Sequence, residues 1–210
     1  MRIEVFENNG RFSWQELTDL MHDAFQERLE QGLHFTCSFM TAEELKRQLA
    51  DSTILVAVDY DNKGVIVGMA AINVKDDEKG KWAYMSDLAV KPQYKRCGIM
   101  TCLFQKLEGV AKLNGCEYIE SDTAVGAKSS VKWHKKNGFK IVDLYSFKST
   151  NYYSYIFKKD LTSYPHKTNP FRDKILFWKK ALQCRIYLLE NGQDRESKFL
   201  DFYLKLRGVK

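Results

Sequence analysis

The sequence lacks a run of about 18 apolar residues, the length that a membrane-spanning helix requires. Its opening stretch, MRIEVFENNG, also lacks the apolar segment of a signal peptide and instead predicts a short strand. Only three prolines and no low-complexity tract occur, so extensive disorder is not expected. With 44% hydrophobic residues in a chain of 210, these absences predict one substantial folded core and no membrane span.

The cysteines show no spacing typical of a disulfide framework or a zinc site. Their number is odd, no Cys-x-x-Cys pair occurs, and no cluster of His, Cys and Asp has metal-ligand spacing. We therefore predict reduced thiols, a cytoplasmic protein and no bound metal. The five cysteines are Cys37, Cys97, Cys102, Cys116 and Cys184.

The positive charge of the chain is concentrated towards its C-terminus. Residues 1–164 contain 22 basic and 22 acidic side chains, whereas residues 165–210 contain 11 basic and 5 acidic ones and carry the whole net charge of +6. The segment YPHKTNP, residues 164–170, holds two of the three prolines and is typical of a linker. This composition predicts a folded domain over residues 1–163, the linker, and a basic helical tail over residues 171–210.

Hydrophobic periodicity and turn residues predict strands and helices throughout the domain. Apolar residues at helical spacing mark the helices, and Thr41 with Glu44 three residues later forms a capping box. The predicted strands cover residues 2–6, 52–58, 64–74, 81–90, 116–125, 139–147 and 151–161, and the predicted helices cover 14–30, 41–50, 98–113 and 128–137. This order indicates an α/β (α+β) fold in which helices flank a mixed sheet.

Two further helices are predicted in the tail, near residues 171–190 and 194–207. Apolar side chains of the first recur along one stripe, which includes Ile175, Trp178 and Leu182. Such a stripe favours packing on the domain itself or a homodimer contact, and its basic, Trp-bearing character also fits a membrane surface. No recognised nucleic-acid-binding fold or motif is present, so we expect no nucleic-acid partner.

The stretch QYKRCGIMTCLF, residues 93–104, joins a predicted strand to a predicted helix. A helix N-terminus has several N–H groups without an intrahelical acceptor and a partial positive charge, so it can bind an anion. Gly98 permits close approach of a ligand to the backbone, while Lys95 and Arg96 add positive charge. Neither the dinucleotide motif G-x-G-x-x-G nor the phosphate loop G-x-x-x-x-G-K-[ST] is present, which leaves a plain turn or another kind of phosphate site.

Two motifs give the sequence its resemblance to a known family, the GCN5-related N-acetyltransferases (GNAT). LAVKPQYKRCGIMTCLFQKL, residues 88–107, is similar to their acetyl-CoA motif, in which a strand, a glycine-containing turn and a helix follow one another. SSVKWHKKNGF, residues 129–139, is similar to their second motif, a short helix that ends in Gly-Phe. The resemblance covers roughly residues 1–160, and it extends to the order of the predicted elements.

The sequence departs from the pattern of the family at four positions. Lys95 stands where the family prefers Gln or Arg, and Met100 stands where it prefers Gly or Ala. Ala127 and His134 occupy positions that often hold Asn and Tyr. The first two changes leave the backbone N–H groups of the turn in place, although the larger Met100 would shift the pyrophosphate or weaken its binding.

The resemblance implies a mostly antiparallel central sheet with a V-shaped splay, and acetyl-CoA as co-substrate. It implies that the pantetheine arm lies in the gap between the strands 82–90 and 116–122, and that the turn holds the pyrophosphate. The residues implied to contact the cofactor are Leu88, Ala89, Val90, Lys95, Arg96, Cys97, Gly98, Ile99, Met100 and Thr101. Cys97 either is a reactive thiol at a helix N-terminus or only fills space, and the second interpretation is favoured.

Acetyl transfer to an amine needs a proton acceptor, a donor for the oxyanion and, in some enzymes, an acid for the thiolate. Asp87 and Tyr84 lie on the strand that faces the splay, but strict alternation places their side chains on opposite faces. Asp87 is a candidate base or a structural carboxylate, with Glu120 a remote alternative. His134 is a candidate acid by its place in the second motif, or a histidine on the helix surface beside Trp133.

These features together predict an acetyl-CoA-dependent N-acetyltransferase that works by direct attack of a primary amine in a ternary complex. A small-molecule or peptide amine is the expected acceptor, and its identity is not encoded in any motif. The alternative is a catalytically degenerate acyl-CoA-binding module with a regulatory or membrane-surface role. Met100 and the absence of an obvious base favour that alternative.

Overall fold

A computed structural model describes residues 2–78, 80–147 and 149–162, together with 175, 178–183 and 186. The predicted order of strands and helices is confirmed, with short 3₁₀ turns at Thr36–Ser38 and Pro92–Tyr94. The elements are β1 (Ile3–Glu7), α1 (Trp14–Glu30), α2 (Ala42–Gln48), β2 (Thr53–Asp59), β3 (Val65–Asp77), β4 (Gly80–Val90), α3 (Ile99–Leu113), β5 (Tyr118–Ala124), α4 (Lys128–Lys136), β6 (Lys140–Ser146) and β7 (Tyr153–Asp160).

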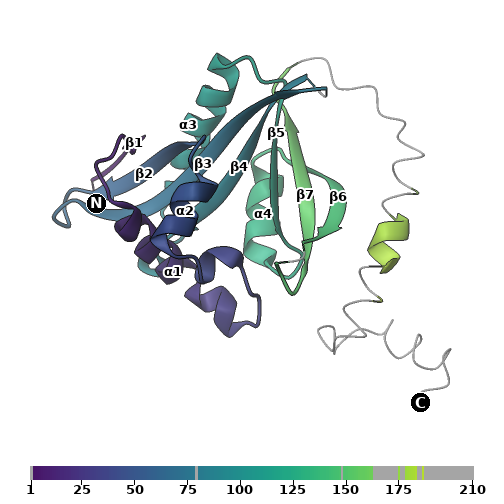
Figure 1. Ribbon diagram of the computed structural model, residues 1–210, viewed down its shortest axis with the longest axis horizontal. Coiled ribbons are helices and arrows are strands. Elements are labelled where there is room, and N and C mark those ends of the chain that lie inside the picture. The colour runs from purple at the N-terminus through teal and green to yellow at the C-terminus, as the bar shows by residue number, and fades with distance from the viewer. Residues whose placement is uncertain are drawn as a thin grey trace.

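The seven strands form one sheet in the order β1-β2-β3-β4-β5-β7-β6. Every neighbouring pair is antiparallel except β4 and β5, which run parallel and pair only over Trp82–Tyr84 and Tyr118–Glu120. Beyond these three pairs the two strands separate, as Figure 1 shows at the centre of the molecule. The mixed, mostly antiparallel sheet and its V-shaped splay are therefore confirmed.

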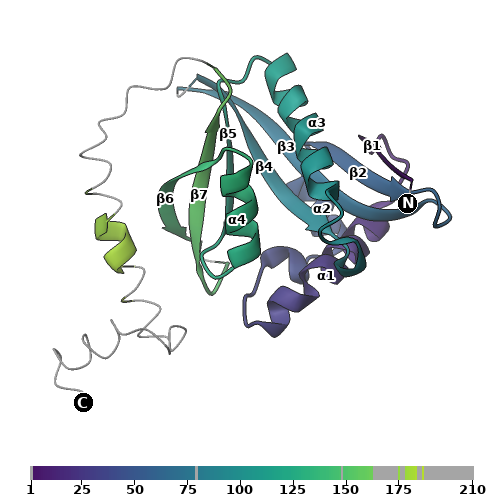
Figure 2. The same cartoon turned by 180° about the vertical axis from the view of Figure 1, so that it is seen from behind.

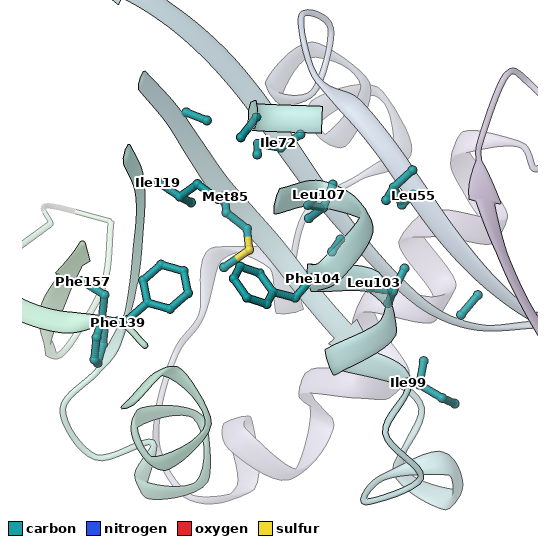
Figure 3. Packing of buried hydrophobic residues seen from close by; sticks show 14 of the residues in the cluster. Leu55, Ile72, Met85, Ile99, Leu103, Phe104, Leu107, Ile119, Phe139 and Phe157 are labelled. Atoms are coloured by element: carbon teal, nitrogen blue, oxygen red, sulfur yellow. The ribbon is translucent and has the colours of Figure 1, made fainter. Parts of the chain in front are cut away.

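Helices cover both faces of the sheet, with α1 and α2 on one side and α3 and α4 on the other (Figure 2). The core beneath α1 and α2 includes Leu17, Leu20 and Leu45. The core beneath α3 includes Leu103 and Phe104 and is drawn in Figure 3. Burial of each such side chain stabilises the fold by about 1.5–3 kcal/mol, so these two cores hold the helices against the splayed strands.

Capping boxes begin the two helices on the first face. Ser13 and Glu16 exchange side-chain and backbone hydrogen bonds at the start of α1, and Thr41 and Glu44 do the same at α2, as predicted. Loss of such a cap typically costs about 1 kcal/mol, because the first N–H groups of a helix have no other acceptor. The caps therefore fix where α1 and α2 begin, and so where their C-terminal ends reach over the sheet.

The described part of the tail consists of helical residues between 175 and 186. Lys180 Nζ lies 2.6 Å from Asp143 Oδ1 on the edge strand β6. Ile175, Trp178 and Leu182 are nevertheless exposed, so the expected packing of this stripe on its own domain is wrong for these three side chains. The predicted linker and the second tail helix lie outside the described residues.

Candidate active site

A cavity of about 1440 Å³ opens where β4 and β5 separate. Its walls come from α1, the segment 35–40, the C-terminal half of β4, the start of α3, and α4. The loop between β6 and β7 completes it with Phe147, Ser149 and Thr150. The predicted cofactor turn and the predicted catalytic residues thus face one continuous space, although they come from distant parts of the chain.

The turn before α3 presents a row of backbone N–H groups to this cavity. In the described chain, no backbone carbonyl accepts from the N–H groups of residues 96–100. Arg96 and Gly98 both have positive φ angles, +65° and +80°, and this backbone shape makes successive N–H groups point into one concave site. Such a site at the N-terminus of a 15-residue helix suits a phosphate group.

Two residues of the predicted cofactor set have backbone N–H groups that are not available to a ligand. The N–H of Lys95 donates to Pro92 O at 3.2 Å, and the N–H of Thr101 donates to Gly98 O at 2.9 Å. Their backbone N–H groups are therefore occupied, although both residues line the cavity. The available row begins at Arg96, because the short 3₁₀ turn at Pro92–Tyr94 uses the N–H of Lys95.

Gly98 keeps open the space in front of the turn. A Cβ atom placed on Gly98 would meet no heavy atom within 4 Å, so the protein itself does not require a glycine for packing. The positive φ angle does favour glycine, because other residues adopt it only with strain. The empty space beside the N–H row is where a ligand would approach the backbone.

The C-terminal end of α1 contacts both the cofactor turn and α4. Glu27 forms an ion pair with Lys95, and this pairing lowers the pKa of Glu27. Arg28 Nη2 donates to Ser129 Oγ on α4 at 2.5 Å. These contacts could not be predicted from the sequence, since the partners are 68 and 101 residues apart and neither pair belongs to a motif.

A β-bulge in β4 overturns the predicted orientation of Asp87. On β3, Ala71 pairs with Ser86 and Met69 pairs with Ala89. Asp87 and Leu88 on β4 therefore both lie opposite Ala70. Asp87 has a φ of +54°, and the extra residue interrupts the alternation of side chains. The prediction that Tyr84 and Asp87 face opposite sides is therefore wrong. Asp87 is bonded to Gln48 of α2, and Tyr84 alternates with Met85, which packs in the core beneath α3, so both side chains lie on the α1–α2 side of the sheet.

The side chain of Asp87 is held by a neighbouring helix. Gln48 Nε2, at the end of α2, lies 3.1 Å from Asp87 Oδ1 and 3.0 Å from Oδ2. Burial raises the pKa of Asp87, and the negative charge of Asp122 raises it further, while hydrogen bonds from Ser86 and Gln48 lower it. The net effect is a carboxylate that accepts a proton more readily than an exposed aspartate does.

Tyr84 and Asp122 face each other across the splay. The Tyr84 hydroxyl donates a hydrogen bond to Asp122 Oδ1. Burial raises the pKa of Tyr84 well above its usual value, and the charges of Asp122, Asp87 and Glu120 raise it further. Tyr84 therefore stays protonated at neutral pH and acts as a hydrogen-bond donor. Glu120 does not line the cavity.

His134 is not on the surface of α4, so that interpretation is wrong. It is 1% exposed and stacks on Phe157 with ring centroids 4.4 Å apart. Nδ1 lies 2.9 Å from Ser130 O, which only a protonated nitrogen can approach as a donor, and Nε2 lies 3.2 Å from Ser121 Oγ. Burial lowers the pKa of His134, so the ring is neutral at pH 7 with both nitrogens already hydrogen-bonded.

The remaining candidates have simpler surroundings. Cys97 is exposed, and its nearest polar partner is the carbonyl of Lys95 at 3.7 Å. Thr101 Oγ1 accepts from Trp133 Nε1 at 3.3 Å, which joins α3 to α4. In the described ranges no group of three or more His, Cys, Asp or Glu side chains is arranged to hold a metal ion. Nor is any helix there both long and apolar enough to cross a membrane.

Comparison with known proteins gives a consistent result. A family model described as Acetyltransferase (GNAT) family matches residues 14–139. Among curated proteins, the chain is similar to an aminoglycoside N(6')-acetyltransferase type 1 of Acinetobacter genomosp. 13, with 28% identity over 102 residues, which cover 46% of this chain and 70% of that protein.

Solved structures share the fold. One is a PaiA N-acetyltransferase from Thermoplasma acidophilum in complex with coenzyme A, with a TM-score of 0.58 and 18% identity over 76% of this chain and 99% of that one. Another is a chain of the NatC complex bound to Gag peptide and CoA, with a TM-score of 0.58 and 16% identity over 77% of this chain and 100% of that one.

Proposed function

The chain belongs to the GNAT family of acetyltransferases and is an acetyl-CoA-dependent N-acetyltransferase; we propose that it acetylates a primary amine by direct attack in a ternary complex at the β4–β5 splay. The observation that carries this proposal is the row of free N–H groups at residues 96–100, next to the splay. Small-molecule and peptide amines are the acceptors of the family, and the two relatives described above represent both kinds.

For the cofactor, we propose that the N–H groups of residues 96–100 hold the diphosphate, and that the Lys95 and Arg96 side chains add charge. The backbone of Leu88, Ala89 and Val90 would run beside the pantetheine arm, because β4 has no strand partner on that side beyond Tyr84. The hydroxyl of Thr101 and the backbone of Cys97, Ile99 and Met100 complete the contacts. We propose that the thioester then lies between the bulge of β4 and the end of β5.

For the reaction, the amine nitrogen attacks the thioester carbonyl carbon, and the carbonyl oxygen becomes an oxyanion. We propose that a backbone N–H of Leu88 or Ala89, beside the bulge, donates to that oxygen. The intermediate then collapses, the carbon–sulfur bond breaks, and CoA leaves as a thiolate. The proton lost by the attacking nitrogen goes to the Asp87 carboxylate, directly or through a water molecule.

Tyr84 and His134 receive supporting roles in this proposal. Tyr84 stays protonated and donates a hydrogen bond to Asp122, so it orients the Asp122 carboxylate and does not accept a proton. For His134 we propose a positioning role in place of the predicted acid role, because a neutral ring with two partners has no free proton to give to a thiolate. It joins α4 to β5 at the edge of the splay.

The experiment that tests the function measures binding and turnover separately. Calorimetric titration with acetyl-CoA should give saturable binding at one site, and thiol release in the presence of a broad panel of amines should then identify acceptors. Absence of acetyl-CoA binding would contradict the proposal. Tight binding without turnover on any amine would support the degenerate binding module instead.

For the tail, the expected homodimer or membrane-surface contact stays a prediction, as does the division into domain, linker and tail. Exposure of Ile175, Trp178 and Leu182 supports a contact with another molecule, and a second copy of this chain is our first choice. Light scattering of the full chain and of a variant with these three residues changed to Ser tests this choice. A monomer in both cases would contradict it. A cytoplasmic location likewise stays a prediction.

A further inference from the structure

The charged side chains that line the cavity differ between its two ends. Lys95 and Arg96 lie at the cofactor turn, whereas Asp87 and Asp122 lie at the splayed ends of β4 and β5, with Lys75 of β3 beside the Tyr84 ring. The thioester joins these ends, because its diphosphate is bound at the first and its reactive carbon reaches the second. This placement rests on the function proposed above, and it leaves the acidic end for the acceptor.

Neither carboxylate at the acidic end has a cationic partner among the described residues. Asp87 is bonded to the neutral amide of Gln48, and Asp122 is bonded to the neutral hydroxyl of Tyr84. The charge of Asp122 reaches Asp87, Tyr152 and His134, since it changes the titration of each of them. Two partly buried negative charges without a counter-ion are costly, and a bound cation would offset that cost.

An aromatic wall stands beside these carboxylates and is a separate observation. The rings of Phe25 and Phe35 are 5.1 Å apart, and those of Phe35 and Tyr152 are 4.8 Å apart, and all three residues line the cavity. Aromatic faces attract ammonium groups and pack against the methylene groups between them. Carboxylates beside an aromatic wall therefore match an alkyl ammonium ion better than a neutral or acidic acceptor.

The two carboxylates have different roles in the proton transfer of the proposed reaction. The attacking nitrogen must be neutral when it forms the new bond, and Asp87 becomes neutral when it takes the proton. Asp122 accepts the hydrogen bond of Tyr84, whose hydroxyl keeps its own proton, so the proton transfer is assigned to Asp87 and not to Asp122. A monoamine thus leaves Asp122 without a counter-ion at the moment of reaction, whereas a second ammonium group on the acceptor would pair with it.

We propose that the acceptor is a small di- or polycationic amine, whose second ammonium group pairs with Asp122 while the first amine reacts beside Asp87. The relative that acts on aminoglycosides, compounds with several amino groups, is consistent with this class. The aromatic wall holds the carbon skeleton that joins the two nitrogen atoms. The basic groups at the other end of the cavity favour the anionic cofactor and disfavour binding of the cation there.

Matched acceptors test this proposal. Diamines of three to five methylene groups are compared with the monoamines of equal length, in thiol-release assays and in calorimetric titration of the complex with CoA. We expect the diamine to have the higher kcat/KM and the tighter binding by about tenfold or more, the size of one charged hydrogen bond. Equal values for diamine and monoamine would overturn the inference, and measurable acetylation of both would leave the N-acetyltransferase function intact.

A matched pair of variants assigns the effect to Asp122. Asp122→Asn should reduce the preference for the diamine to near unity, whereas Asp160→Asn, an exposed carboxylate on the adjacent strand β7 outside the cavity, should preserve it. Thermal unfolding of both variants checks that the fold is retained. An unchanged preference in Asp122→Asn would overturn the inference. Loss of acetyl-CoA binding in the unmodified protein would instead overturn the proposed function and the inference with it.

Discussion

The start of α3 and the splayed ends of β4 and β5 face the same cavity, but they offer different chemical groups to a ligand. The first offers backbone N–H groups in a turn whose shape depends on two positive φ angles. The second offers the side chains of Asp87, Tyr84 and Asp122, held by partners on other elements. A site built from backbone tolerates changes of side chain, whereas a site built from side chains changes its specificity with each substitution.

This difference bears on how much each region can be inferred from the family pattern. Lys95 and Met100 alter side chains of the turn, but the N–H groups that would bind the diphosphate remain. At the splay, each residue sets charge or proton affinity directly. The cofactor can therefore be inferred from the family, while the acceptor has to be inferred from the particular side chains of this chain.

The largest expected effect on cofactor binding comes from closing the space at the backbone site. Gly98→Ala places a methyl group where the diphosphate would lie, so we expect acetyl-CoA affinity to fall by about 100-fold or more, or about 2.7 kcal/mol. Gly115→Ala is the matched control, because Gly115 has a φ of +73°, equally open surroundings and a place at the other end of the same helix. Equal loss of affinity in both variants would show that strain, not the ligand space, is responsible.

The next effect concerns the side-chain site. Asp87→Asn removes the proposed base, so kcat should fall by about 10²–10⁴-fold, while acetyl-CoA affinity should change little. Single-turnover thiol release and calorimetry measure these two quantities. A kcat within threefold of the unmodified enzyme would return Asp87 to a structural role, and the bulge would then serve only to shape β4.

A smaller effect on rate is expected from His134→Phe. Loss of the ring nitrogens leaves Ser121 Oγ buried without its partner, which typically costs about 1–3 kcal/mol of folding free energy. Because the proposed role is one of position, kcat should fall by less than about tenfold and the pH–rate profile should keep its shape. Disappearance of one limb of that profile would identify His134 as the acid after all.

Asp87 also makes stability depend on pH in a predictable direction. Its pKa is raised in the folded protein, so the folded state binds more protons than the unfolded state between the two pKa values, and stability falls as pH rises through that range. Asp87→Asn should therefore raise Tm by a few degrees at pH 8, and this gain should vanish near pH 4. A gain that is constant across this pH range would contradict the assignment of the raised pKa.

The smallest expected effect is at the ion pair between α1 and the cofactor turn. Glu27→Gln frees Lys95 from its carboxylate partner, so acetyl-CoA should bind roughly two- to fivefold more tightly at low salt. Calorimetry at rising salt should show the gain shrinking, since exposed charges are screened. Glu30→Gln, at the end of the same helix but outside the cavity, is the control and should change nothing.

The order of elements could be predicted from the sequence because local signals repeat along it. The Thr41–Glu44 capping box and the alternating or helical apolar residues each depend on a few neighbouring positions. The turn at Gly98 was likewise visible as a motif. These signals extend over one turn of helix or a few strand residues, and they do not depend on the rest of the chain.

The misjudged features depend on contacts between distant residues. The bulge at Asp87 inserts one residue opposite β3, and a strict period of two cannot reveal it. The contacts of Glu27 and Arg28 join segments far apart in the chain. His134 was placed correctly on α4, but its burial against Phe157 depends on how β7 packs, which no pattern around residue 134 encodes.

The short pairing of β4 with β5 divides the sheet into two panels that share a seam of three residue pairs. On one side of the sheet, Phe104 of α3 packs against Trp133 and Phe139. In addition, the hydrogen bond from Arg28 to Ser129 joins α1 to α4. The cofactor proposed to lie in the splay beyond this seam would contact both panels, so it would stabilise their relative position as well as supply the acetyl group.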